Sequence, residues 1–379
     1  MKNYVAVPLA LAALSSAAQA GGLDRTGQSI DILFEKGNYA EFSIGRADPN
    51  LNGRDVAAFN PARTPSGNVA QAFNQAGAGF KLDINDRLSF AMIYDQPWGS
   101  DISYPAANAN PLTPGSALLG GTQAFAESDA ITGLLRYKFN DRFSIHGGLR
   151  WQQVEGNITL NGAAYGGAPP AGLSGYSVRI ERDRALGWVA GAAYEIPDIA
   201  LRVALTYNSE IEHEFRTTEN LNPAITTTTT TKTPQSVNLD FQTGIAPNTL
   251  LMGGIRWADH SETKLRPTLA GVDLIDLEDS TTFSLGVARR FNKNWSGSIL
   301  LEYEEASDDN LVSPLAPTNG FESIAIGLQY TQNKFKVSGG IRYTKLGDAF
   351  AETGTPDVAR ASFTGSDAVS FGIKVGYYF

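Results

Sequence analysis

Alternation of apolar and polar residues with a period of two limits most strongly what this chain can fold into. It is clearest in the stretch VSFGIKVGYYF at 369–379. The apolar positions of this stretch share one parity: Val369, Phe371, Ile373, Val375, Tyr377 and Phe379. Successive side chains of a strand point to opposite faces, so the pattern predicts a β-strand with one apolar face.

The same alternation recurs along the chain, whereas a helical period is hard to find. In FSIHGGLRW, Phe143 and Ile145 share one face and His146 lies on the other. Segments of this kind predict about fourteen strands. Their ranges are 38–47, 76–84, 87–98, 126–139, 142–159, 175–194, 199–217, 235–245, 248–265, 272–291, 294–306, 319–331, 334–348 and 366–379.

The connections between these segments alternate between short and long. The short turns fall at 85–87, 140–142, 196–199, 246–248, 292–294 and 332–334. The long connections are 48–75, 99–125, 160–174, 218–234 with the Thr run 226–231, 307–318 and 349–365, and the link near 266–271 is the shortest of this set. Short turns on one side, long loops on the other and an even strand number are typical of a transmembrane β-barrel.

The mean hydropathy of the chain is −0.18, which taken alone suggests a water-soluble protein. A barrel wall also explains this low mean hydropathy, because its lipid-facing residues are apolar while its lumen-facing residues are polar. Every backbone group in hydrocarbon must be paired, so the sheet must close. We therefore expect an all-β fold, a transmembrane antiparallel barrel of about 14 strands over 38–379. A secreted soluble β-sandwich or propeller is the alternative, with more uniform loops and shorter strands.

The first residues, MKNYVAVPLALAALSSAAQA, place Lys2 before a short apolar run that ends in an A-x-A site. This predicts a secretory signal peptide over 1–20, because the run is too short for a membrane anchor. Residues 21–37 are not needed to close the barrel. A flexible tail is one interpretation of them.

Apolar residues within 21–37 favour a second interpretation, a hatch that plugs the lumen. They include Ile30, Leu33 and Phe34, which a solvated tail would not need. We therefore expect this segment to dock inside the barrel.

Charge and residue usage exclude several classes of function. A net charge of −9 argues against a nucleic-acid partner. The absence of Cys excludes disulfides, Cys-based zinc sites and thiol catalysis. His146, His213 and His260 lack metal-ligand spacing, and no nucleophile elbow, P-loop or dinucleotide fingerprint occurs. We expect no enzymatic activity, no metal and no cofactor.

Parity places a set of basic residues on the lumen side of the expected strands. One interpretation is an interior charge network, with Glu195, Glu302 and Glu304 as acidic partners on the same parity. The other is that one or two of the cations bind a carboxylate ligand, to which the donor fork of Arg is suited. The candidate ligand-binding residues are Arg136, Arg150, Arg202, Arg256, Arg342 and Lys374.

Two stretches and the N-terminal segment resemble the long-chain fatty-acid outer-membrane transporter family (FadL/TodX-like). YAEFSIGRADPNLNG at 39–53 is similar to that family's first strand and its D-P-x-x-x-G loop. FKLDINDRLSFAMIYDQPWGSDISYP at 80–105 is similar to its second and third strands. The resemblance covers nearly all of the chain after the signal peptide. It implies a monomeric barrel with a lumen hatch, extracellular loops that capture hydrophobic ligands, and sideways release beside the third strand.

The resemblance also implies roles for single residues. Pro97 and Gly99 are candidates for the lateral opening, because Pro cannot donate a hydrogen bond to a neighbouring strand and Gly weakens strand pairing. The alternative is that both residues simply mark the end of the strand. Asn60-Pro61-Ala62 falls in the first long loop, unlike the family's tripeptide before strand one, so it receives no hatch role. Apolar loop residues either form a capture surface or pack the loops: Leu118, Leu119, Phe125, Leu311 and Leu315.

The leading functional expectation is passive uptake of hydrophobic compounds across the outer membrane of a Gram-negative bacterium. Long-chain fatty acids come first and aromatic hydrocarbons second. The alternatives are a general diffusion porin for small polar solutes and a structural or adhesion barrel. The expected partners are the hydrophobic ligand, outer-membrane lipid and the barrel-assembly machinery, with the chain a monomer.

Phe379 resembles the terminal aromatic signal that the barrel-assembly machinery reads in outer-membrane proteins. We expect Phe379→Asp to lower the amount of protein inserted in the outer membrane while leaving export intact. Fractionation of cells should find the variant in the periplasm. Equal outer-membrane levels of variant and parent would contradict this role.

Overall fold

The computed structural model describes residues 23–107, 115–307, 310–354 and 357–379. Nearly all of its regular structure is β-strand, and in these ranges no helix has the length and apolarity to cross a membrane. The signal peptide expected over 1–20 lies outside the described residues, as do Gly21 and Gly22 of the expected hatch.

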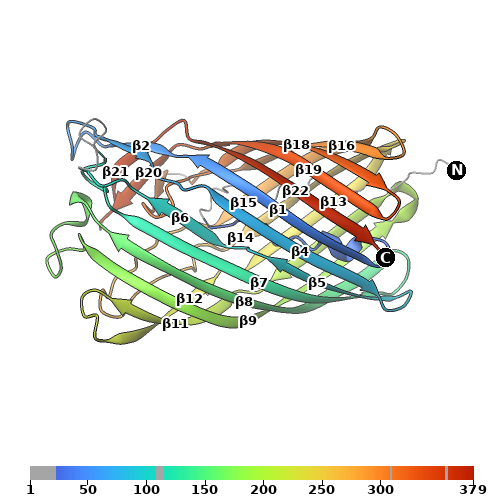
Figure 1. Cartoon of the computed structure of the whole chain (residues 1–379), viewed down its shortest axis with the longest axis horizontal. Helices are drawn as coiled ribbons and strands as arrows, with labels where there is room; N and C mark the ends of the chain where they lie inside the picture. The colour runs from blue at the N-terminus through green and yellow to red at the C-terminus, as the bar shows by residue number, and fades with distance from the viewer. Residues whose placement is uncertain (1–22, 108–114, 308–309, 355–356) are drawn as a thin grey trace.

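The main sheet is a closed antiparallel barrel of 14 strands (Figure 1). Breaks divide some of these strands into two pieces, namely β5 and β6, β10 and β11, and β12 and β13. The pieces in chain order are β1 (Tyr39–Asn50), β4 (Phe73–Asp83), β5 (Leu88–Asp95), β6 (Gly99–Ser103), β7 (Gln123–Lys138), β8 (Phe143–Leu160), β9 (Tyr176–Ile196), β10 (Leu201–Asn208), β11 (Ile211–Glu219), β12 (Thr226–Thr233), β13 (Ser236–Ala246), β14 (Thr249–Ala258), β15 (Ser280–Arg290), β16 (Trp295–Glu304), β18 (Phe321–Gln332), β19 (Phe335–Leu346) and β22 (Asp367–Tyr378).

The seam between β1 and β22 closes the barrel. Its antiparallel register runs from Tyr39 opposite Tyr378 to Asn50 opposite Asp367. Along β22 the lipid-facing Phe371 is 53% exposed, whereas its neighbour Ser370 is fully buried. The alternation in the last segment of the sequence therefore does mark a wall strand with one apolar face.

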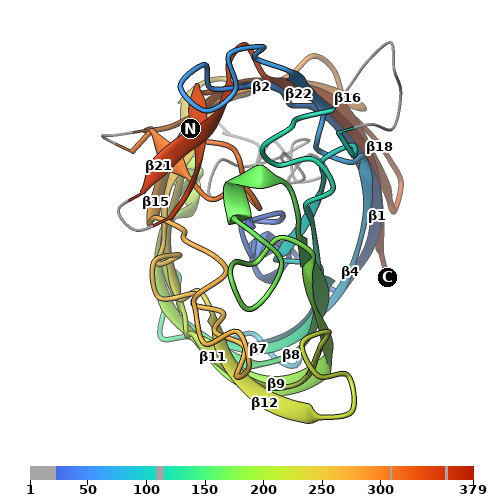
Figure 2. The ribbon, with the colours of Figure 1, turned by 90° about the vertical axis from the view of Figure 1, so that its left-hand side faces the viewer.

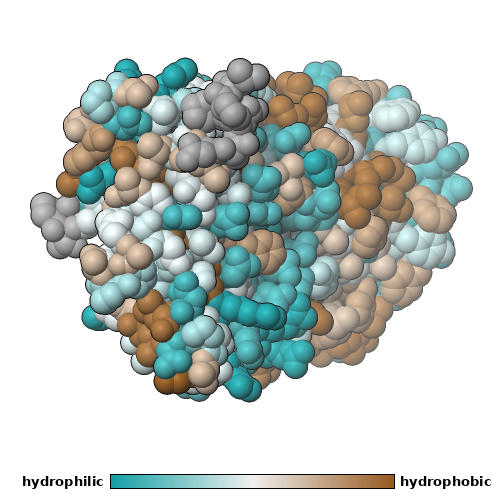
Figure 3. All heavy atoms as spheres, turned by 60° about the vertical axis from the view of Figure 1, so that its left-hand side comes forward, coloured by the Kyte–Doolittle hydropathy of each residue, from teal (hydrophilic) through white to brown (hydrophobic). Residues whose placement is uncertain are grey.

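The outer surface of the wall is apolar. Leu149 and Leu186 expose 62% and 66% of their surfaces, while Arg150, next in the chain, is buried inside. This is the reverse of the pattern in a soluble protein, where large aliphatic residues are mostly buried. Figure 3 shows hydrophobic residues over the wall and mainly hydrophilic ones toward the loop end.

Aromatic rings gather on the outer wall beside the short turns. Three pairs have ring centroids 4.8–4.9 Å apart: Phe143 with Tyr194, Trp295 with Tyr330, and Phe335 with Tyr377. Rings of this kind occupy the membrane–water interface of barrels. Phe379 extends the belt, since its exposed ring stacks on Tyr377 with centroids 6.5 Å apart.

The six predicted short turns are present, at 84–87, 139–142, 197–200, 247–248, 291–294 and 333–334. The prediction that the Thr run 226–231 lies in a long connection is wrong. The run forms β12, which pairs with β11 from Ile211 opposite Thr233 to Thr218 opposite Thr226. Thr is β-branched and favours strands, so the run extends the wall instead of leaving it.

The predicted length of the connection near 266–271 is also wrong. β14 ends at Ala258 and β15 begins at Ser280, so the connection covers 259–279. Apolar residues of this connection that fall within the expected strands 248–265 and 272–291, Leu265, Leu274 and Leu277, are buried. They pack within the loops rather than against lipid, which periodicity alone does not reveal.

The long loops fold over the mouth of the barrel and enclose a core of their own. Figure 2 looks in from this end and shows loops and the N-terminal segment inside the wall. The loop core includes Leu51, Tyr104, Leu119, Tyr176 and Phe363, all at most 1% exposed. A small sheet lies here, made of β17 (Leu311–Val312), β20 (Ala349–Thr353), β21 (Val358–Phe363), β2 (Asn52–Asp55) and β3 (Pro65–Asn68). The short 3₁₀ turns are η2 (Asp31–Phe34), η3 (Ala163–Tyr165) and η4 (Pro197–Ile199).

Substitutions on the two faces of β15 test which face of the barrel wall contacts lipid. Leu285 is 52% exposed toward lipid, and its neighbour Ser284 lines a cavity in the lumen. We expect Leu285→Arg to lower the free energy of unfolding by about 2–4 kcal/mol, because a cation on the lipid face near the midplane lacks solvation. Equilibrium unfolding in lipid vesicles measures this. Ser284→Arg is the control, and an equal loss there would contradict the assignment of faces.

Candidate functional site

The N-terminal segment docks inside the lumen, as expected of a hatch. Ile30, Ile32 and Leu33 are at most 5% exposed and pack against the wall residues Ala91 and Leu134. A solvated tail would leave such side chains in water. The hydrophobic contacts of η2 therefore anchor this hatch, the described residues 23–37, to the inner wall.

Phe34 lies between two of the predicted lumen cations. The guanidinium carbons of Arg136 and Arg202 lie 4.5 and 4.3 Å from its ring centroid. His146 meets the same ring edge-to-face, with centroids 6.2 Å apart. Cations stacked on an aromatic ring are attracted to the negative face of the ring. Phe34 of the hatch and the lumen cations Arg136 and Arg202 therefore stabilise each other's positions.

Each acidic residue of the hatch forms an ion pair with a cation from a different strand. The distance from Asp24 Oδ2 to Arg256 Nε is 2.6 Å, and that from Asp31 Oδ1 to Arg202 is 2.8 Å. Glu35 pairs with Lys336. Electrostatic contacts with β14, β10 and β19 thus tether the hatch around the lumen.

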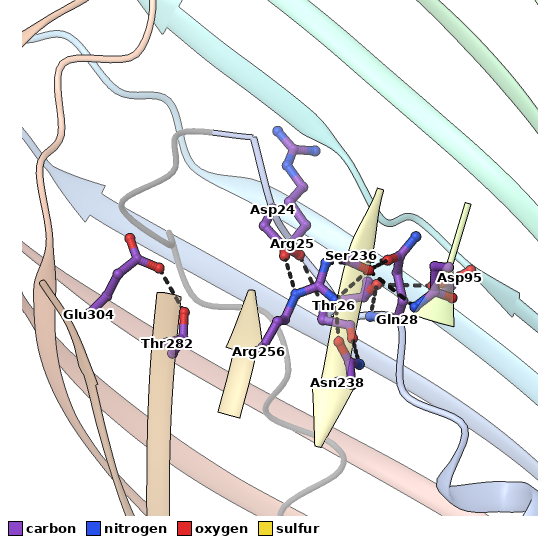
Figure 4. A network of polar contacts seen from close by, with 12 residues as sticks. Asp24, Arg25, Thr26, Gln28, Asp95, Ser236, Asn238, Arg256, Thr282 and Glu304 are labelled. Carbon is purple, nitrogen blue, oxygen red and sulfur yellow. Dashed lines mark hydrogen bonds and ion pairs between the residues drawn. The ribbon is translucent and has the colours of Figure 1, made fainter. Parts of the chain in front are cut away.

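Arg256 is the centre of the hatch network (Figure 4). Besides its bond to Asp24, it donates to Ser236 Oγ at 3.0 Å and to Asn238 Oδ1 at 2.7 Å. Ser236 in turn donates to Gln28 Oε1 of the hatch at 2.8 Å. Buried polar groups that satisfy one another in this way hold a single arrangement.

The remaining predicted cations have partners on the wall. Arg136 pairs with Glu195, Arg342 with Glu302 at 3.0 Å, and Lys374 with Glu41 at 3.0 Å. Arg150 donates to Thr132 Oγ1 at 2.8 Å. Five of the six candidate cations are therefore in ion pairs, the arrangement of an interior charge network. Ligand binding by these residues stays a prediction.

Three of these cations meet at one polar cavity in the lumen. Arg202, Arg256 and Arg342 line a space of about 210 Å³ beside the hatch residues Thr26 and Asp31. Lys374 lines a different space between β1 and β4. Sequence parity therefore located these residues on the lumen side but did not show which of them converge.

The wall is interrupted where Pro97 and Gly99 lie. β5 pairs with β4 only from Ala78 to Asp83, and β6 pairs with β7 on its other side. β4 residues 73–77 consequently have no ladder partner on this edge within the described chain. The side chain of Gln96 partly fills the gap, since its Oε1 accepts a bond from the Ala76 N–H at 3.0 Å.

The hatch supplies backbone partners at this break. Gly99 N–H donates to the Leu23 carbonyl at 2.8 Å, and Arg25 N–H donates to the Pro97 carbonyl at 2.8 Å. Asp24 and Trp98 form an antiparallel bridge between them. The two predicted lateral-opening residues are thus in direct contact with the hatch, and their role as an opening stays a prediction.

An apolar cavity of about 120 Å³ lies on the loop side of the break. Its walls include Trp98, Phe125, Phe215, Leu277 and Leu315, and Leu23 of the hatch also reaches it. The lining also includes polar residues, among them Glu127, Glu155 and Lys232. Another of these, His213, is satisfied by Asp183 at 3.0 Å and Gln152 at 3.2 Å. The apolar side chains supply nearly all of the surface that the cavity exposes, and such a surface is suited to a hydrophobic ligand.

The expected capture residues divide between this cavity and the loop core. Phe125 and Leu315 line the cavity, Leu118 and Leu119 are buried in the loop core, and Leu311 begins β17. Trp98, Phe215 and Leu277 were missed because they come from a strand break, from β11 and from a long loop, respectively. No periodic signal in the sequence links such positions.

One group of carboxylates among the described residues is close enough to hold a cation. Asp276, Glu352 and Asp357 place oxygens within 4.8 Å of one another at the loop end. Lys264 lies 3.3 Å from Asp276 and supplies counter-charge there. We assign no metal to this group.

Comparison with solved structures shows the same fold. The chain matches a crystal structure of a Pseudomonas aeruginosa FadL homologue with a TM-score of 0.73, 15% identity and 100% coverage of both chains. It matches the Pseudomonas putida toluene transporter TodX at 0.61, with 11% identity and 91% of each chain covered. The CymD monoaromatic hydrocarbon channel matches at 0.57, with 12% identity and 91% and 89% covered. A search of curated proteins found no match.

The family model for outer membrane protein transport proteins matches residues 46–379. The match includes the wall strands, the break and the long loops. With a closed barrel, an apolar outer wall and a lumen hatch, the chain belongs to the outer membrane protein transport family (OMPP1/FadL/TodX), whose members are outer-membrane channels for hydrophobic compounds.

Proposed function

We propose that this chain is a passive outer-membrane channel that takes up long-chain fatty acids, with aromatic hydrocarbons as the second candidate substrate. The observation that carries this proposal is the apolar cavity between the loop core and the strand break. A hydrophobic molecule gains free energy there, roughly 25 cal/mol for each Å² of apolar surface removed from water. No cofactor or energy source is needed for movement down a gradient.

The position of the cavity supports a path through the wall. Trp98 and Gly99 belong both to the cavity and to the break in the third strand. A ligand that leaves beside Pro97 and Gly99 enters the membrane and avoids the charged lumen below. We therefore propose lateral release there, once the hatch segment Leu23–Arg25 separates from the break.

Names of the similar structures support both candidate substrates. They include a FadL homologue, a toluene transporter and a monoaromatic hydrocarbon channel. Their identity to this chain is at most 15%, so they support the fold and leave the ligand to be tested. Embedding in outer-membrane lipid as a monomer, and insertion by the barrel-assembly machinery, are part of the same proposal.

The hatch argues against the alternative of a general porin. A porin has an open aqueous lumen, whereas here three ion pairs and the apolar contacts of η2 hold a segment inside it, which supports a plugged channel. An adhesion barrel would not need an apolar cavity behind its loops.

Uptake by proteoliposomes tests the proposal. Vesicles that contain the protein should take up oleate faster than empty vesicles, and equal rates would refute transport. Leu277→Glu places a charge in the cavity and should lower the rate at least several-fold, since an unpaired carboxylate is costly in an apolar site. Leu269→Glu, on the exposed part of the same loop, is the matched control and should leave the rate unchanged.

Conductance across planar bilayers tests the plug. The wild type should show little steady conductance. Asp24→Asn, Asp31→Asn and Glu35→Gln together should raise it several-fold, because each change leaves a lumen cation unpaired and removes a hatch tether. Asp198→Asn, in the exposed turn η4, is the control. High wild-type conductance, unchanged in the triple variant, would favour the porin.

A further inference from the structure

Arg25 lies where the hatch crosses the break in the wall. Its N–H donates to the Pro97 carbonyl at 2.8 Å, and its own carbonyl accepts a bond from Gln75 Nε2 at 3.2 Å. Both contacts use the backbone, so they fix the position of Arg25 while leaving its side chain free for another role.

The guanidinium of Arg25 fills the gap between β4 and β6. It lies over the ring of Phe73, with 4.1 Å from Cζ to the centroid. A Cβ on Gly99 would lie 2.4 Å from Arg25 Cζ, so only glycine permits this close approach. In Figure 4 the side chain points away from the Arg256 network.

Arg25 differs from the paired lumen cations in its charge environment. Within the described ranges, no carboxylate lies within 4.0 Å of its guanidinium and no side-chain hydrogen bond is made to it. The carboxylates of Asp101 and Glu127 act on it only from farther away. A partly buried guanidinium with unused donors is a strong site for an anion that accepts two hydrogen bonds.

The space around Arg25 adjoins the apolar cavity. Arg25, Phe73 and Asp101 line a small cavity of about 60 Å³, and Gly99, Ser100 and Ala316 line both this cavity and the apolar one. A cationic site and an apolar site thus lie on two sides of one strand segment. This pairing matches a molecule that has an anionic head and a hydrocarbon chain.

We propose that Arg25 binds the carboxylate of a long-chain carboxylic acid whose alkyl chain lies in the apolar cavity. This inference rests on the proposed channel function and names the residue that selects an acid over a neutral hydrocarbon. Asp101, in the same small cavity, opposes the bound carboxylate and limits its affinity. A neutral hydrocarbon or alcohol gains nothing from Arg25.

Binding of two 12-carbon probes to the purified full chain in mild detergent tests the proposal. The probes are dodecanoate and 1-dodecanol, which share a chain length and differ in head-group charge. We expect Arg25→Gln to weaken dodecanoate binding roughly tenfold or more, the loss of a charge-assisted contact, and to change dodecanol binding less than twofold. Arg25→Lys should keep part of the preference, and Arg87→Gln, exposed in a short turn, is the control.

Two further variants test the mechanism without removing the arginine. Gly99→Ala should displace the guanidinium and reproduce the effect of Arg25→Gln, with no further loss when the two are combined. Asp101→Asn should strengthen dodecanoate binding several-fold. Heat-dependent gel migration confirms that each variant is a folded barrel.

The outcomes separate this inference from the channel function. Equal effects of Arg25→Gln on both probes, or no effect on either, would overturn the role of Arg25. Binding of dodecanol without dodecanoate by the wild type would overturn the carboxylate class while the channel function stands. Binding of neither probe would count against the channel function itself.

Discussion

The requirement that every backbone N–H and C=O be paired in hydrocarbon governs the rest of this structure. A sheet can meet it only by closing, and the pairing of β1 with β22 does so. Closure creates an inside that lipid cannot reach. That inside is where the paired lumen cations and the hatch are found.

The same requirement explains why the break in the third strand needs other hydrogen-bond partners. Between β5 and β6 the ladder to β4 is lost, and the exposed polar edge is satisfied by Gln96 and by the hatch residues Leu23–Arg25. A segment held by such contacts separates at lower cost than a full ladder, because few hydrogen bonds break. The break is thus a weak place in the wall, and its residues Trp98 and Gly99 also line the apolar cavity.

Charges in the lumen serve chiefly to position the hatch and the wall. Arg256, Arg202 and Lys336 each take an acidic partner from the hatch, and Arg342 and Lys374 take partners from neighbouring strands. Pairing neutralises these cations and leaves their local field weak. Arg25, without such a partner among the described residues, stands out for this reason.

Much of the fold was predictable from the sequence, because the period of two is a local property. Each expected strand corresponds to a strand of the barrel, and Arg136, Arg150 and Lys374 were placed on the lumen side by parity alone. The errors came where local preference and environment differ. Thr226–Thr233 extends the wall, although its sequence predicted a loop. The apolar residues of 259–279 pack among the loops, although their sequence predicted wall strands.

The sequence by itself determined most of the strands, their faces, the compartment and an N-terminal segment that docks inside the barrel, since each depends on neighbours along the chain. Only the tertiary structure decided which charges pair, that the hatch meets the break at Pro97–Gly99, and that Trp98, Phe215 and Leu277 share a cavity. These contacts join residues that are far apart in sequence. They depend on the stagger of the strands and the folding of the loops, and parity carries no information about either.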